Sequence, residues 1–294
     1  MQLALTLVGP DAQAAVGQVA PALAAARARV KEPRPLGPDA LDLLVEAQDL
    51  VSARHAVKPV LDDLAVDYCL QPWNDRRKSL LIADMDSTII GCECIDELAD
   101  FAGVKDKVSA ITERAMRGEL DFEAALRERV AMLKDLPVAD LQLAYDQRVR
   151  LNPGARTFVR TMAAHGARCL LVSGGFTFFT ERVAAAAGFD ENRGNTLGVE
   201  GDRLDGTVIG AILGREAKLA ALQKGAARLG LMAAETLAIG DGANDLAMIE
   251  AAGLGLAYRA KPIVAAEADA KIDHADLTAA LYFQGYTADQ FVTD

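Results

Sequence analysis

Two carboxylates and two hydroxyls follow a short apolar run within residues 80–90, which have the sequence LLIADMDSTII. An apolar run of this length is typical of a strand buried on both faces of a parallel sheet. Asp84 and Asp86 then lie at its carboxyl end, where open α/β sheets bind their ligands. Because side chains two apart on an extended chain point the same way, both carboxylates can face one cavity. Two anions this close repel each other, and a shared proton or a hard cation relieves the repulsion.

Taken alone, this motif is equally consistent with an acidic strand end followed by a turn, because Asp, Ser and Thr are common turn residues. Two further buried runs also end in polar motifs: SGG at 173–175 follows the run 168–172, and DGAND at 241–245 follows the run 236–240. Lys218 lies on an expected helix between these two motifs. Three polar strand ends in this order predict a single site at the carboxyl edge of a parallel sheet.

The elements that position these motifs alternate between strands and helices, which predicts an α/β fold with a doubly wound parallel sheet. The expected core strands are 79–84, 168–172, 236–240 and, as the last one, 253–257; the expected helices are 155–165, 177–187, 215–229 and 245–251. Residues 194–213 predict a β-hairpin with its turn at Asp205-Gly206-Thr207.

The segment between the first two core strands is too long for a simple crossover connection. Its apolar residues recur at a spacing of three and four, which indicates helices. Gly103, Gly118 and Pro137 divide it into about four of them. We therefore expect a helical cap inserted over about 91–152.

The first 72 residues predict a separate small domain. Its expected elements are strands 2–9, 29–35, 40–47 and 65–71 with helices 11–28 and 52–64. This βαββαβ order is that of a ferredoxin-like α+β unit, and it resembles the small ACT-type domains that bind amino acids or pair with each other. A purely structural or dimerising role is equally consistent. Residues 73–78 are polar and predict a linker to the second domain, 79–294.

Composition narrows the classes of function. The chain has 294 residues, 51% hydrophobic and 25% charged, as expected for a globular protein. A net charge of −11 disfavours a nucleic-acid partner. No run of about 18 apolar residues predicts a membrane span, and the start lacks the regions of a signal peptide, so a cytoplasmic location is expected.

The cysteines and histidines of the sequence do not indicate a metal site or a catalytic site. Cys92 and Cys94 could form half of a zinc site, but no second cluster in the sequence completes it. None of the three histidines belongs to a recognisable constellation. Acid–base chemistry is therefore expected from carboxylates or lysine.

The series DMDST, SGG, Lys218 and GDGAND resembles the haloacid dehalogenase (HAD) superfamily of phosphatases. ERAMRG at 113–118, FEAALRERV at 122–130 and VSGGF at 172–176 make the chain more similar to the phosphoserine phosphatases of that superfamily. The similarity covers about 78–284. It implies Mg²⁺-dependent hydrolysis of O-phospho-L-serine to L-serine and phosphate through an aspartyl-phosphate, the last step of serine biosynthesis.

The resemblance also implies a role for each matching residue. Asp84 is the expected nucleophile and Asp86 the general acid and base. The expected metal ligands are Asp84, the main-chain carbonyl of Asp86, and Asp241. The expected substrate-binding residues are Glu93 for the ammonium, Arg129 for the carboxylate, Ser173, Gly174 and Lys218 for the phosphate, and Asn244. Met116 and Phe122 are expected to screen the site from water.

Two other functions stay open at this point. The same chemistry could act on another small phosphomonoester, or pass the phosphoryl group to an acceptor other than water. Alternatively, the chain could be a non-catalytic amino-acid sensor that acts through its first domain. Glu93 and Arg129 favour a zwitterionic substrate over a sugar phosphate, which would not need both charges. The alternative explanation for these two residues is an ordinary charged surface of the cap. A homodimer is consistent with the sequence but not indicated by it.

Overall fold

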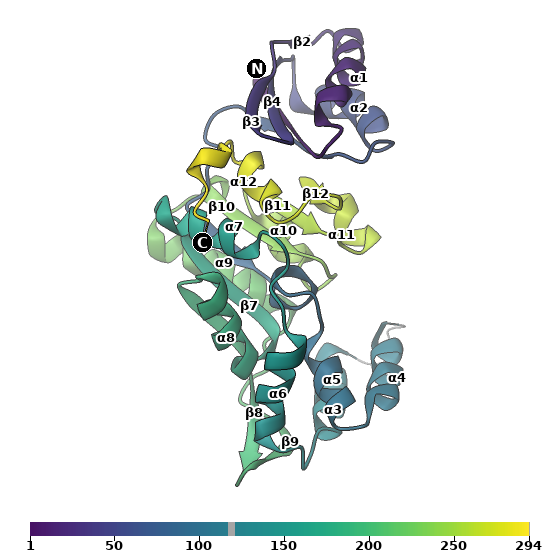
Figure 1. Ribbon diagram of the computed structural model, residues 1–294, viewed down its shortest axis with the longest axis vertical. Coiled ribbons are helices and arrows are strands. Elements are labelled where there is room, and N and C mark those ends of the chain that lie inside the picture. The colour runs from purple at the N-terminus through teal and green to yellow at the C-terminus, as the bar shows by residue number, and fades with distance from the viewer. Residues whose placement is uncertain (117–120, 294) are drawn as a thin grey trace.

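The computed structural model describes residues 1–116 and 121–293 and contains two β-sheets (Figure 1). The smaller sheet belongs to the N-terminal part of the chain, and the larger one to the part that follows residue 79. None of the helices in these described ranges is both long enough and apolar enough to cross a membrane.

The N-terminal part has the predicted βαββαβ order. Its elements are β1 (Gln2–Val8), α1 (Ala12–Ala25), β2 (Arg29–Val30), β3 (Arg34–Gly37), β4 (Ala40–Glu46), α2 (Leu50–Leu61) and β5 (Asp67–Pro72). The sheet is antiparallel, in the order β2-β4-β1-β5, with β3 also paired to β4. The strand expected over 29–35 is divided in two, and Pro33, which cannot donate a ladder hydrogen bond, lies in the gap between β2 and β3.

The larger sheet confirms the predicted α/β class. Its strands are β6 (Leu80–Ala83), β7 (Arg168–Phe176), β8 (Glu191–Glu200), β9 (Arg203–Ile209), β10 (Thr236–Gly240), β11 (Leu254–Tyr258) and β12 (Ala270–Ile272), in the spatial order β12-β11-β10-β6-β7-β8-β9. All neighbouring pairs are parallel except β8 and β9. Because β6 lies between β7 and β10, the three polar strand ends meet at one edge.

Helices cover both faces of this sheet, as doubly wound folds require. Leu81 and Ala83 of β6 belong to the core beneath α7 (Ala155–Ala164) and α8 (Thr177–Ala187). Leu80 and Ile82 point the other way and belong to the core beneath α9 (Arg215–Leu229), α10 (Leu246–Ala251) and α11 (Pro262–Glu267). An apolar strand buried on both faces is what the run at 80–83 predicted.

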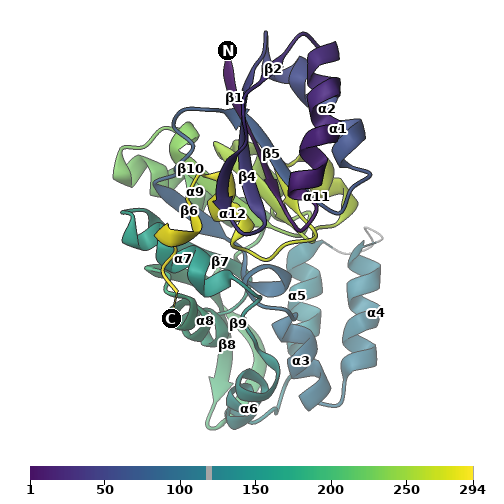
Figure 2. The same ribbon diagram turned by 45° about the horizontal axis from the view of Figure 1, so that its top comes forward.

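The segment after β6 forms a helical cap, which Figures 1 and 2 show to one side of the sheet. Its described helices are α3 (Cys94–Phe101), α4 (Lys105–Met116), α5 (Phe122–Ala131) and α6 (Val138–Arg148). A bridge between Ile90 and Leu151 joins the two chain segments that connect the cap to the core. The expected helix break at Gly118 and the side chain of Met116 lie outside the described residues.

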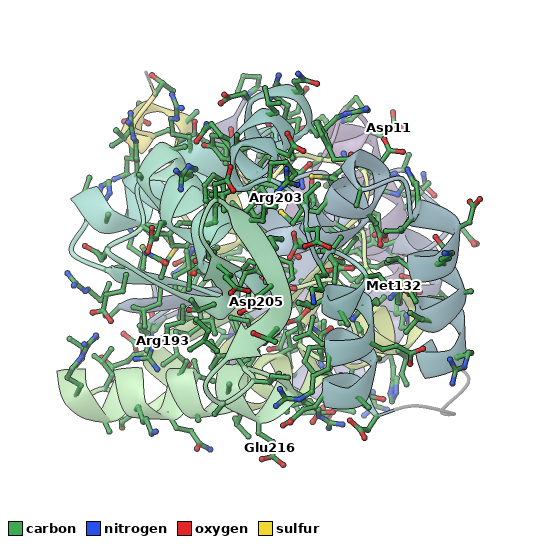
Figure 3. The ribbon with its side chains drawn as sticks, turned by 90° about the horizontal axis from the view of Figure 1, so that it is seen from below. Asp11, Met132, Arg193, Arg203, Asp205 and Glu216 are labelled. Carbon is green, nitrogen blue, oxygen red and sulfur yellow. The ribbon has the colours of Figure 1, made fainter. Side chains whose placement is uncertain are left out.

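Two expectations about the strands are wrong. The hairpin turns at Gly201-Asp202, where Gly201 adopts a left-handed φ of +64°, and Asp205 lies within β9 instead (Figure 3). The Asp205 carboxylate accepts hydrogen bonds from the amide and hydroxyl of Thr207, so this polar side chain has hydrogen-bond partners within the strand. The last strand of the sheet is β12, which follows the strand expected at 253–257. The sequence did not indicate β12, because its three residues are too few to show an alternation of apolar and polar side chains.

The N-terminal sheet packs on the core through the face that its own helices leave uncovered. Leu3, Leu5 and Leu7 face α1 and α2, whereas Asp42 and Arg76 form a buried ion pair at 2.7 Å. Asp67 accepts hydrogen bonds from the three consecutive amides of residues 273–275 at 2.7–3.2 Å, and α12 (Ala279–Phe283) also contacts this sheet. The division into 1–72, a linker at 73–78 and 79–294 stays a proposal.

Candidate active site

A cavity of about 560 Å³ lies between the carboxyl edge of the larger sheet and the cap. The predicted site residues that line it are Asp84, Asp86, Glu93, Arg129, Ser173, Gly174, Asp241 and Asn244, together with Phe122. Lys218, the remaining predicted residue, is buried beneath the cavity and contacts Asp84. The structure therefore brings the predicted residues together from β6, β7, β10, α9 and the cap.

Asp84 follows β6 directly, and contacts of both its backbone and its side chain fix its position. Its amide donates to the Ile239 carbonyl of β10 at 3.0 Å, which extends the sheet ladder by one residue. Its Oδ1 accepts from the Met85 amide at 2.8 Å and lies 2.7 Å from Lys218 Nζ. Burial raises the pKa of the Asp84 carboxyl, as does the Asp245 charge, and the Lys218 ammonium opposes this rise.

Lys218 lies between two carboxylates in a site that excludes water. Only 2% of the residue is exposed, and its Nζ is 2.7 Å from Asp84 and 2.6 Å from Asp245. Burial alone would lower the pKa of this ammonium, but the two carboxylates more than offset that effect and raise it. Lys218 therefore stays charged, and it presents a fixed positive charge beneath Asp84.

Asp86 lies beside the SGG motif rather than in the acidic cluster. Its two carboxylate oxygens accept from the Cys94 amide at 3.1 Å and the Ser173 hydroxyl at 3.2 Å. Burial, and then the negative charge of Glu93, raise the pKa of Asp86 to about 6. A carboxyl with that pKa can exist in either protonation state near neutral pH, as an acid–base catalyst must.

Asp84, Asp241 and Asp245 form the acidic cluster, with one ligand oxygen of each within 4.8 Å of the others. Burial, and then the negative charges of Asp245 and Glu93, raise the pKa of Asp241 to about 6. Oxygen donors with excess negative charge fit a hard divalent cation. Asp245 differs from the other two, because its oxygens already accept from Lys218 and from the amides of Asp241 and Gly242.

The two glycines of the SGG motif at the end of β7 let the backbone of this strand lie close to the other site residues. A Cβ added at Gly175 would lie 2.7 Å from Asp86 Oδ2, so a side chain there would displace a carboxylate oxygen of the site. A Cβ added at Gly174 would lie 3.1 Å from the Phe122 ring. Phe122 of the cap therefore lies against the motif.

Glu93 and Arg129 lie on the cap side of the cavity. Glu93 accepts a hydrogen bond from the Ser87 hydroxyl at 2.6 Å. Arg129 is partly buried, which lowers its pKa, while the charges of Asp96 and Glu93 act in the opposite direction. Its Nε donates to the Ala125 carbonyl at 3.2 Å, one turn earlier on α5.

Four polar residues of the cavity were not predicted: Ser87, Asp96, Thr112 and Lys261. Asp96 lies in the first turn of α3, three positions after its N-cap residue Glu93, so helical spacing could have indicated it. Ser87 is part of the DMDST motif, but the sequence does not show that its hydroxyl contacts Glu93. Thr112 and Lys261 enter the cavity only through tertiary packing, which leaves no local signal.

Residues 81–250 match the family model of haloacid dehalogenase-like hydrolases, and the chain belongs to that family. Within it, the chain is similar to curated phosphoserine phosphatases. It is 47% identical to the one from Streptococcus thermophilus, over 68% of this chain and 93% of that one, and 42% identical to the one from Archaeoglobus fulgidus, over 78% and 67%.

Solved structures agree with this assignment. A HAD family hydrolase from Salmonella enterica serovar Typhi matches 96% of this chain and 98% of its own, with 28% identity and a TM-score of 0.87. A substrate-bound phosphoserine phosphatase matches 70% of this chain and 98% of its own, with 39% identity and a TM-score of 0.65. The protein is therefore a phosphatase, and a purely non-catalytic sensor is not supported.

Proposed function

We propose that this protein hydrolyses O-phospho-L-serine to L-serine and inorganic phosphate. One observation carries the proposal: Asp84 and Asp86 line a single cavity above the buried Lys218, and Glu93 and Arg129 line the same cavity on its cap side. The first group suits a phosphate ester, and the second supplies one charge for each ion of a zwitterion. Similarity to curated phosphoserine phosphatases supports the same substrate.

Hydrolysis would proceed in two steps on the two carboxylates. A carboxylate oxygen of Asp84 attacks phosphorus, and the bond to the serine oxygen breaks as Asp86 protonates that oxygen. Asp86 then removes a proton from water, whose oxygen attacks the phosphorus of the aspartyl-phosphate and releases Asp84. The Cys94 amide donates a hydrogen bond to Asp86, which holds its carboxyl in place for both proton transfers.

Mg²⁺ would be held by Asp84 and Asp241 of the acidic cluster and by the main-chain carbonyl of Asp86. When bound, this ion would neutralise part of the charge on nucleophile and phosphate. Asp245 would serve mainly to orient Lys218 and the loop at 241–242, since its oxygens are already engaged. Thr88 supports the site by donating to Asp241 at 3.3 Å.

The transferring phosphoryl group would lie between Asp84 and the SGG motif. The Ser173 hydroxyl, the Gly174 amide and Asn244 would donate to its oxygens, and Lys218 would oppose the charge that develops there. Phe122 lies over Gly174 and would limit the access of water.

Replacing Arg129 tests the substrate directly. Arg129→Ala should lower kcat/KM for O-phospho-L-serine on the order of 10- to 100-fold, because a charge-assisted hydrogen bond to the carboxylate is lost. Hydrolysis of p-nitrophenyl phosphate, which has no carboxylate, should fall much less. Steady-state phosphate release measures both.

Arg127 provides the matched control on the same helix. Its side chain is 54% exposed and pairs at 3.9 Å with Glu123 rather than lining the cavity. Arg127→Ala should leave both rates close to those of the unmodified protein. Equal losses on the two substrates in Arg129→Ala would show that Arg129 does not bind the substrate carboxylate.

The cytoplasmic location and the possibility of a homodimer stay predictions from the sequence. The similarity of residues 1–72 to ACT-type domains also stays a prediction, although the βαββαβ order is present.

A further inference from the structure

Ser87 has a backbone conformation that is unusual for a residue with a side chain. Its φ is +56°, in the left-handed region that glycine adopts freely and that serine adopts at a cost. Such residues persist where the surrounding structure holds them, often at functional sites. Ser87 lies between Asp86 and Thr88, both of which contact the site. Its own contacts should therefore show what holds it.

Two hydrogen bonds tie Ser87 to the start of α3. Its hydroxyl donates to Glu93 Oε1 at 2.6 Å, and its amide donates to the Cys92 carbonyl at 3.2 Å. Glu93 is the N-cap residue of α3 and is exposed, so its side chain would otherwise be free to adopt several rotamers. The hydroxyl of Ser87 therefore selects one orientation of the Glu93 carboxylate.

That orientation places negative charge near other acids. Glu93 lines the same cavity as Asp86 and Asp241, so its carboxylate and theirs repel one another. Without a cation beside it, Glu93 would gain by turning toward solvent. A substrate ammonium supplies such a cation, whereas a neutral group does not.

We propose that Ser87 is a positioning residue for substrate specificity. Its hydroxyl holds the Glu93 carboxylate in the cavity against neighbouring acids, so that the site prefers an ester with an ammonium group. This inference rests on the proposed phosphoserine activity and deepens it.

The test compares two esters that differ at one group. O-phospho-L-serine carries an ammonium where L-3-phosphoglycerate, which has the same configuration at C2, carries a hydroxyl. In Ser87→Gly and Ser87→Ala, the ratio of kcat/KM between these esters should fall about fivefold, as expected for one lost hydrogen bond. The change should come from a higher KM for phosphoserine, because the ammonium is bound in ground and transition states alike. Glycine also removes the backbone strain, so Ser87→Gly should fold even if Ser87→Ala does not.

A double-mutant cycle separates positioning from a general structural effect. In a Glu93→Ala background, Ser87→Gly should cause no further change in the ratio, because the group that Ser87 orients is gone. An unchanged ratio in the single Ser87 variants would overturn the inference, as would an equal further fall in the Glu93→Ala background. If the unmodified protein showed no preference for phosphoserine, the proposed function and this inference would fail together.

Discussion

Asp84→Asn should abolish turnover while the fold survives. An amide cannot attack phosphorus as a carboxylate does, so we expect kcat to fall on the order of 10⁴-fold or more. Asparagine is nearly isosteric, and Lys218 would keep Asp245 as its partner at 2.6 Å. Phosphate release and thermal unfolding measured on the same sample check both parts of this expectation.

Deamidation would restore aspartate at this position, so the sample requires intact-mass analysis. A substantial rate in a protein verified as asparagine would contradict the assignment of Asp84 as the nucleophile. Loss of the folded state would show that Asp84 is also needed for stability.

Lys218→Met should be the most destabilising single change in the site. It leaves Asp84 and Asp245 buried without the ammonium that both contact at 2.6–2.7 Å. Removing one partner of a buried ion pair typically costs about 3–5 kcal/mol of unfolding free energy. Denaturant unfolding in the presence of EDTA measures this cost without a bound cation that could offset it.

Two matched variants make this result specific. Lys224 is exposed on the same helix, and Lys224→Met should change the unfolding free energy little. Adding Asp245→Asn to Lys218→Met should recover part of the loss, because one buried negative charge disappears. A loss in Lys218→Met no larger than in Lys224→Met would mean that the Lys218 contacts contribute nothing measurable.

The larger sheet and the core of the site could be predicted from the sequence, because the order of the parallel strands determines where most of the site residues lie. Parallel strands present their carboxyl ends at one edge, so motifs that follow β6, β7 and β10 must converge there. Strand β6 could also be predicted, because an apolar run without alternation is typical of a strand buried on both faces. The identification of Lys218, in contrast, depended on family resemblance, since a lone helical lysine is usually exposed.

The remaining features depend on contacts between distant segments. Nothing local indicates that Asp67 binds amides about 206 residues later, or that Thr112 faces the cavity. Asp205-Gly206 has the composition of a turn, yet it lies within β9 because Gly201 supplies the left-handed conformation at the actual turn. Tertiary pairing outweighed local preference there.

The most direct test is phosphate release from four esters, each with Mg²⁺ and with EDTA: O-phospho-L-serine, 3-phosphoglycerate, phosphoethanolamine and p-nitrophenyl phosphate. We predict Mg²⁺-dependent hydrolysis with a clear preference for O-phospho-L-serine, since 3-phosphoglycerate lacks the ammonium and phosphoethanolamine lacks the carboxylate. Mg²⁺-dependent release that favours another ester would retain Asp84 and Asp86 but remove the roles given to Glu93 and Arg129. Release from none of the four would contradict the proposed function.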